Sequence, residues 1–138
     1  MPGLDAFSHV SLTVPDAERS AEFYNGVLGT ETVFVGEHLV IVARGPVMIA
    51  FCDHPEIVGT TFDPARVGLD HVALQVPSRA ELEAWETSLL AAGVTCSPIE
   101  TSPFGSHLNL KDPDNIAIEL FAPGRASPEP TQTGGWPS

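Results

Sequence analysis

The chain is poor in basic residues and has no long apolar run. Its 138 residues hold six Lys and Arg against 18 Asp and Glu, so its formal net charge is −12. Nucleic acids and anionic membranes bind proteins through basic patches, and this balance argues against both as partners. No apolar run approaches the ~20 residues that a membrane-spanning helix needs. The N-terminus also lacks the basic and then apolar segments of a secretory signal.

Cysteine is scarce as well, and several catalytic motifs are missing. Cys52 and Cys96 form no C-x-x-C pair, so we expect free thiols in the reducing cytoplasm rather than a disulfide. The sequence has no G-x-S-x-G, Walker loop or H-E-x-x-H motif to support a serine hydrolase, a nucleotidase or a zincin. Apolar residues still make up 43% of the chain, enough for the core of one domain or of two fused half-size modules.

One heptapeptide occurs twice. HVSLTVP begins at His9 and HVALQVP begins at His71, and the two copies share His, Val, Leu, Val and Pro. In both, apolar residues alternate with smaller or polar ones, which is the period of a strand. A helical stretch follows each copy, and each half then ends in another apolar strand. Only the second half carries a carboxylate in the middle of its last strand, at Glu119.

Both halves predict the same order of elements. Asp16 is the expected N-cap of the first helix, which ends at Gly29. Ser78 and Glu81 form a capping box at the start of the second helix, which ends at Gly93. The strands are expected at residues 6–14, 31–36, 38–43 and 46–52, and again at residues 69–76, 94–100, 105–111 and 115–121.

This order predicts an α+β fold of two βαβββ modules that form a cupped mixed β-sheet. Neither module can bury both faces of its own small sheet, so the modules must pack together or against a second chain. We expect one domain over residues 1–123, with modules at 6–52 and 69–121 joined by a linker at 53–68. Residues 124–138 are rich in Pro, Gly and Ser, and we expect them to form a flexible tail.

The matched histidines and the strand carboxylate suggest a metal site. Neutral imidazole is the commonest side-chain ligand of mid-series divalent metals. A carboxylate among apolar residues is costly unless it is paired or bound to metal. His9, His71 and Glu119 therefore predict a centre with two imidazole ligands and one carboxylate. The alternative is a pair of hydrogen-bonded histidines at strand starts and a glutamate that faces solvent from an edge strand.

A fourth ligand is not expected from the first half. Aligning VMIAFC with IAIELF places Ala50 at the position of Glu119, and an alanine side chain cannot bind metal. Cys52 or His54 would contribute a ligand only if the strand bulges, and Cys52 is otherwise a small buried residue. The site would then keep open positions for water and substrate.

Other side chains are candidates for the chemistry and the walls of the site. His107 lies one hairpin before the strand of Glu119, where it is either an acid or base of the reaction or a surface histidine. Phe34, Phe51 and Phe104 are expected either to line a substrate pocket or to pack in the core.

The chain resembles the vicinal oxygen chelate superfamily. The resemblance rests on the repeated βαβββ plan, on FYNGVLG at 23–29 and on GSHLNLKDPDNIAIELF at 105–121, and it covers about residues 6–123. The superfamily includes glyoxalase I, bleomycin-resistance proteins, fosfomycin-resistance proteins and extradiol dioxygenases. Its members usually pair, so the resemblance implies a homodimer.

The resemblance also implies ligand positions and two departures. Metal-dependent members carry ligands at the places of His9, His71 and Glu119. Glyoxalase I-like members carry a fourth ligand at the place of Ala50, so this site looks more like those of the fosfomycin-resistance and dioxygenase members. Extradiol dioxygenases carry a Tyr that assists ring cleavage where this chain has Asn109, which we expect to contact substrate instead.

The expected function is that of a metal-dependent enzyme with dioxygenase-, lyase- or isomerase-like chemistry. Its substrate would be small, largely apolar and bound to the ion through neighbouring oxygens, because the six basic residues form no cluster for a phosphonate or for glutathione carboxylates. Fe2+ or Mn2+ is favoured over Zn2+ or Ni2+. The alternative is a protein that gives antibiotic resistance by sequestering a drug without turnover, as bleomycin-resistance members do.

Overall fold

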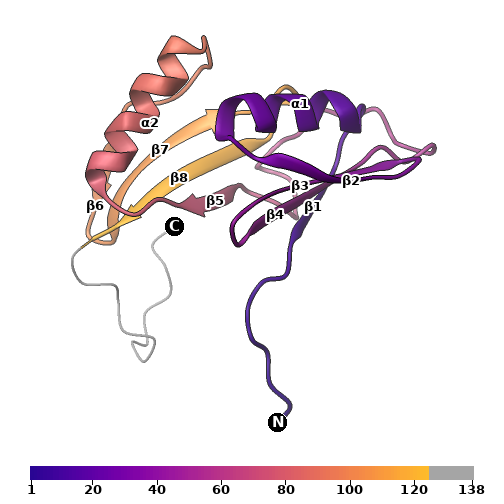
Figure 1. Ribbon diagram of the computed structural model, residues 1–138, viewed down its shortest axis with the longest axis horizontal. Helices are drawn as coiled ribbons and strands as arrows, with labels where there is room; N and C mark the ends of the chain where they lie inside the picture. The colour runs from indigo at the N-terminus through magenta and orange to yellow at the C-terminus, as the bar shows by residue number, and fades with distance from the viewer. Residues whose placement is uncertain (125–138) are drawn as a thin grey trace. The chain divides into compact units, whose positions relative to one another are not determined.

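The computed structural model of the chain describes residues 1–124, and the rest of the expected tail lies outside the described residues (Figure 1). The chain divides into two compact units. The first unit holds Met1–Asp70 and Lys111–Ile116, and the second holds His71–Leu110 and the chain from Ala117. Each unit carries one helix and one four-stranded mixed sheet, which confirms the α+β class and the repeated element order.

The sheet of the first unit has the strand order β1-β4-β3-β2. Its strands are β1 (Val10–Thr13), β2 (Glu31–Val35), β3 (Leu39–Arg44) and β4 (Val47–Cys52). Strand β1 runs parallel to β4, and the other neighbours are antiparallel. Helix α1 (Ala17–Leu28) lies against β3 and β4 on one face of this sheet (Figure 1).

Helix α1 begins and ends where the sequence predicts. The Asp16 carboxylate accepts a hydrogen bond from the Arg19 N–H at 3.0 Å, and Gly29 ends the helix with a left-handed φ of 72°. Asp53, just beyond β4, also accepts the Ala17 N–H at 3.0 Å. The hydrogen bond from this helix N–H lowers the pKa of the Asp53 carboxyl most, and the neighbouring His38 ring lowers it further. The start of the helix is thus tied to the end of the central strand.

The sheet of the second unit has the order β5-β8-β7-β6. Its strands are β5 (Val72–Gln75), β6 (Glu100–Ser102), β7 (Gly105–Lys111) and β8 (Ala117–Pro123). Strand β5 runs parallel to β8, which repeats the β1–β4 pairing of the first unit. Helix α2 (Arg79–Ala91) has Ser78 as its N-cap, as predicted, and buries Leu82 and Leu89.

Several predicted strands have other bounds in the structure. The strands expected at 6–14 and 69–76 are shorter, at Val10–Thr13 and Val72–Gln75. The prediction of a strand at 94–100 is wrong over most of that range, because only Glu100–Ser102 pairs continuously with β7. The Ser97 hydroxyl accepts the Asn109 N–H at 2.9 Å, and Pro98 has no N–H to offer, so a regular ladder cannot continue there. The last strand begins at Ala117 instead of residue 115, because Asn115 has a φ of 66° and belongs to a turn.

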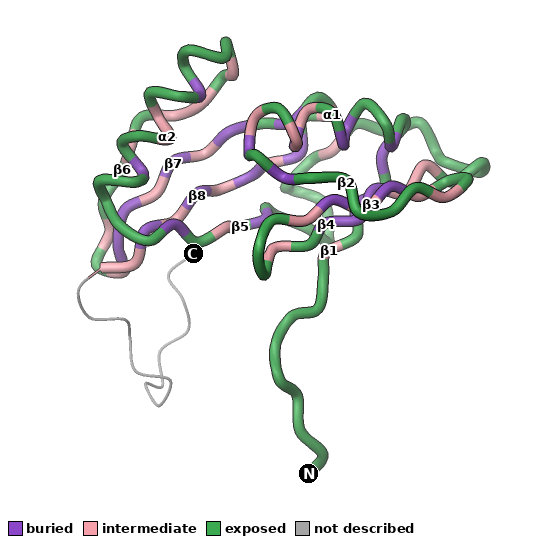
Figure 2. The backbone as a smooth tube through the Cα atoms, viewed as in Figure 1, coloured by how far each residue is buried: buried purple, intermediate pink, exposed green. Residues whose placement is uncertain are grey.

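Figure 2 shows how burial alternates along the strands of the second unit. Ile118, Leu120 and Ala122 of β8 are buried, whereas the residues between them are half-buried. Strand β7 alternates in the same way. One face of the sheet therefore packs in the core with α2, and the other face stays accessible within this unit. Over residues 1–124, no helix is long and apolar enough to span a membrane.

The turn before β8 is organised by one buried carboxylate. Asp112 accepts the N–H groups of Asp114 and Ile116, each at 2.9 Å, and the Tyr24 hydroxyl of α1 at 2.9 Å. Burial raises the pKa of the Asp112 carboxyl, although the Ile116 N–H and the Tyr24 hydroxyl oppose that change. Burial makes the largest contribution to raising the pKa of the Tyr24 hydroxyl, and the negative charge of Asp112 raises it further. The hydroxyl therefore keeps its proton and remains a donor.

The raised pKa of Asp112 predicts that the stability of the fold depends on pH. A raised pKa means that the folded protein holds a proton at Asp112 at pH values where the unfolded chain has released it. The free energy of unfolding should therefore fall as the pH rises from the ordinary Asp value through the raised one. Asp112→Asn should remove this slope, because an amide can keep the two N–H bonds and donate to the Tyr24 hydroxyl. Chemical denaturation of both proteins between about pH 3.5 and 7 measures it.

The control is Asp112→Ala, which leaves two N–H groups and one hydroxyl without their partner. It should lower the free energy of unfolding by about 1–3 kcal/mol. Equal slopes in the parent and in Asp112→Asn would show that Asp112 does not titrate with folding.

Candidate functional site

The accessible face of the second sheet carries a row of polar side chains. The His71 Nε2 lies 3.4 Å from the Glu119 Oε2, across the parallel pair of β5 and β8. The Glu119 side chain is 17% exposed and that of His71 is 39% exposed, so this pair lies at the surface of its unit without being fully solvated. Because Ile118 and Leu120 turn into the core, Glu119 projects from the opposite face.

The register of the β7–β8 hairpin brings more polar residues to this face. The Asp112 N–H donates to the Ile116 carbonyl, and the Gly124 N–H donates to the Phe104 carbonyl. Both bonds belong to one unbroken antiparallel register, in which Asn109 lies opposite Glu119. The same register puts His107 opposite Phe121. We call the polar side chains of this face, those of His71, Glu100, His107, Asn109 and Glu119, the polar face.

A second imidazole–carboxylate pair lies on the polar face. Glu100 of β6 is the direct register partner of His107, and its Oε2 lies 3.5 Å from the His107 Nε2. The side chain of His107 is 22% exposed, and that of Glu100 is 68% exposed. Sequence reasoning missed Glu100. The signal was present, because a tight hairpin centred on Pro103 and Phe104 would set these two residues opposite each other.

The first sheet repeats this register with other residues, and Ala50 stands where the second sheet has Glu119. Ser11 pairs with Ala50, as Ala73 pairs with Glu119, and Ser11 and Ala73 hold the same place in the repeated heptapeptide. The register therefore supports the alignment of Ala50 with Glu119. His9, directly before β1, is exposed, and its Nδ1 lies 2.9 Å from the Ser8 hydroxyl.

The structure brings together two of the three residues expected to hold a metal. His71 and Glu119 form a pair in the second unit, and His9 belongs to the first unit. Within the part of the chain that the structure describes, no three His, Cys, Asp or Glu side chains are gathered around one point. The pair itself offers an imidazole nitrogen and a carboxylate, which are suitable donors for Fe2+, Mn2+, Zn2+ or Ni2+.

The aromatic candidates lie in three different environments. Phe51 is fully buried, and its ring centroid lies 4.7 Å from that of Tyr24, so its place is the core between β4 and α1. Phe34 is 51% exposed on β2, an edge strand of the first sheet. Phe104 is half-buried in the turn between β6 and β7. Of the three, only Phe104 belongs to the unit that holds the polar face.

Comparison with known proteins gives the family. The family model of the Glyoxalase/Bleomycin resistance protein/Dioxygenase superfamily matches residues 6–120. No curated protein matches the chain. Among solved structures, a glyoxylase/bleomycin resistance protein/dioxygenase domain from Frankia sp. EAN1pec is 32% identical, with a TM-score of 0.79 over 90% of this chain and 96% of that one.

Two more distant structures share the fold. A lactoylglutathione lyase from Agrobacterium tumefaciens is 20% identical, with a TM-score of 0.72 over 88% of this chain and 96% of that one. The fosfomycin resistance protein FosX from Mesorhizobium loti is 19% identical, with a TM-score of 0.66 over 89% of this chain and 96% of that one. With the repeated unit and the matched strand registers, these findings show that the chain belongs to the Glyoxalase/Bleomycin resistance protein/Dioxygenase superfamily.

Proposed function

We propose that this protein is a metal-dependent enzyme that acts on a small, largely apolar substrate bound through two neighbouring oxygens. The observation that supports this most is the His71–Glu119 pair, 3.4 Å apart on the accessible face of the second sheet. His9 stands at the place in the first heptapeptide that His71 holds in the second, and we propose it as the third ligand. A divalent ion, Fe2+ or Mn2+ before Zn2+ or Ni2+, would supply Lewis acidity toward the substrate oxygens.

The side chains around the pair have roles in this proposal. We assign His107 as the proton carrier: its Nε2 lies 3.5 Å from the Glu100 carboxylate, which would hold the ring so that Nδ1 takes a proton from substrate and returns it. The Asn109 amide, opposite Glu119, would hold a substrate oxygen in place. Phe104 would provide an apolar contact, and Phe34 would do so only if its edge strand reaches the site. The protein would work as a homodimer in the cytoplasm, where Cys52 and Cys96 stay reduced.

The test begins with metal content. Protein purified without chelators and without a nickel-affinity tag is analysed for bound metals, and then reconstituted anaerobically with each of the four ions. We expect about one ion per chain. Candidate chelating substrates are then titrated against the loaded and the metal-free protein. Binding that disappears on chelation, followed by product formation, supports the enzyme.

Sequestration without turnover remains the second candidate because of an exposed apolar edge. Val33, Phe34 and Val35 of β2 are each more than half exposed, and such an edge can receive an aromatic drug. Equal binding of an aromatic natural product to the loaded and the metal-free protein, with no product formed, would favour this candidate over the enzyme.

Ala50→Glu provides a test of the ligand geometry. Since Ala50 occupies the register position of Glu119, a carboxylate there should become a further ligand and strengthen metal binding by about tenfold or more. It should also slow turnover by filling an open position. Isothermal titration calorimetry with Mn2+ or Zn2+ measures the affinity.

The matched control is Ala43→Glu, which adds the same charge to the next strand of the same sheet. It should leave the metal affinity unchanged. If Ala50→Glu binds metal no more tightly than Ala43→Glu does, position 50 does not face the ion.

A further inference from the structure

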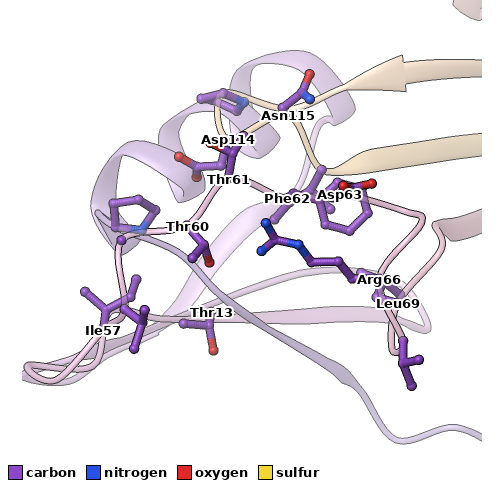
Figure 3. Close-up of a pocket in the computed structure, with 16 residues that line it drawn as sticks. Thr13, Ile57, Thr60, Thr61, Phe62, Asp63, Arg66, Leu69, Asp114 and Asn115 are labelled. Carbon is purple, nitrogen blue, oxygen red and sulfur yellow. The ribbon is translucent and has the colours of Figure 1, made fainter.

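The first unit contains a cavity that shares no residue with the proposed metal centre. Its volume is about 570 Å³, and Figure 3 shows the side chains around it. One wall is the end of β1 with Thr13 and Pro15, the second is the linker at 57–69, and the third is the turn at 113–116. All three walls belong to the first unit, so the cavity lies within one compact body.

The turn wall is held firmly. The Asp112 carboxylate fixes its backbone through the N–H groups of Asp114 and Ile116. The Asp114 carboxylate, in turn, pairs with the Arg19 guanidinium and accepts the Ser20 hydroxyl at 3.3 Å. The charge of Asp114 is therefore already compensated by α1, and this wall is preformed for a ligand.

The linker wall presents the one cation that lines the cavity. Asp63 closes a local turn by accepting the Ala65 N–H with its carboxylate at 2.9 Å and the Arg66 N–H with its carbonyl at 3.2 Å. Figure 3 shows the Arg66 guanidinium extending into the cavity on the side of Thr60. Among residues 1–124, no carboxylate forms an ion pair with this guanidinium. Its five donors are available to a ligand.

The remaining lining selects the class of ligand. It is largely apolar, with side chains of Ile57, Val58, Phe62, Leu69 and Ile116. Ile57 and Leu69 are each 37% exposed, and an apolar ligand would cover them. A cavity of this size suits a small molecule.

The charge of the ligand follows from the same walls. A single arginine binds a carboxylate through two parallel hydrogen bonds. A second negative charge would meet the carboxylate of Asp63 and a chain with a net charge of −12. We propose that this cavity is a second binding site, for a small monocarboxylate with an apolar body, with Arg66 as its anchor.

Calorimetric titration of the full chain with benzoate, phenylacetate and hexanoate tests the proposal, and benzyl alcohol and hexanol serve as neutral analogues. We expect the carboxylates to bind more tightly than the alcohols. Arg66→Gln should weaken carboxylate binding by about tenfold and leave alcohol binding unchanged. The control is Lys111→Gln, which removes the same charge from the same unit outside the cavity and should have no effect. Ile57→Glu, which puts a carboxylate at the other end of the linker wall, should also weaken binding.

All titrations are repeated with a chelator, because the metal centre could itself bind a carboxylate. Binding at the Arg66 cavity should not change on chelation, whether or not the protein proves to be a metalloenzyme. The proposal is overturned if no carboxylate binds, if chelation abolishes binding, or if Lys111→Gln weakens it as much as Arg66→Gln. Circular dichroism confirms that each variant is folded.

Discussion

Replacing Glu119 with Ala should remove most of the metal from the proposed centre and abolish the proposed turnover while leaving the chain folded. Glu119 is one of only three proposed protein ligands, and the imidazole 3.4 Å away cannot hold an ion without it. The side chain lies on the accessible face and not in the core, so its removal leaves no cavity beside Ile118 or Leu120. We expect metal affinity to fall by at least about 100-fold, since even the loss of an outer hydrogen-bond partner costs 10–100-fold.

The companion variants are His71→Ala and His9→Ala, and metal content together with circular dichroism is measured for each. The matched control is Glu100→Ala, which removes a carboxylate from the same face of the same sheet. It should leave the metal in place and lower turnover, because the partner that orients His107 is lost. If Glu119→Ala and both histidine variants bind metal like the parent, the three-ligand site does not exist.

A single methyl group at Gly105 should destabilise the fold strongly. Gly105 begins β7 with a φ of 147°, a conformation that residues with a side chain rarely adopt. A Cβ there would lie 2.1 Å from the Ala122 carbonyl oxygen and 2.7 Å from the Gly124 nitrogen, and both are backbone atoms that cannot rotate away. Gly105→Ala should therefore lower the free energy of unfolding by about 3–5 kcal/mol, from backbone strain and from separation of β7 and β8.

The control for this prediction is Gly45→Ala. Gly45 also has a positive φ, 55°, but a Cβ there would meet no atom within 4 Å. Only the backbone penalty of about 1 kcal/mol should remain. Urea denaturation of both variants measures the difference. Similar losses in the two would mean that β7 and β8 can separate at Gly105 at little cost.

Most of the helices and strands, and their repetition, could be predicted from the amino-acid sequence. Asp16 and Ser78 cap their helices, and Gly29 ends the first one, because each of these signals acts through bonds within a few residues. The alignment of Ala50 with Glu119 also followed from the sequence alone. A strand has a period of two, so two copies of one pattern keep the same register when they fold in the same way.

Burial and strand bounds that depend on partners distant along the chain could not be predicted from the sequence. Phe51 is as apolar as Phe34 in the sequence, but Tyr24 covers one ring and solvent reaches the other. The strand expected near residue 94 is replaced by irregular chain because the hydroxyl of Ser97 takes an N–H group of the facing strand.

The candidate sites also combine features that the sequence predicts with features that depend on the folded structure. The sequence identified His71 and Glu119 from residue type and position, but their 3.4 Å separation and the pairing of Glu100 with His107 depend on strand register. No pattern in the sequence predicted the Arg66 cavity. Its walls come from a linker, a strand end and a turn that are distant along the chain, and Asp112 holds only the turn. No local rule of spacing relates residues that only folding makes neighbours.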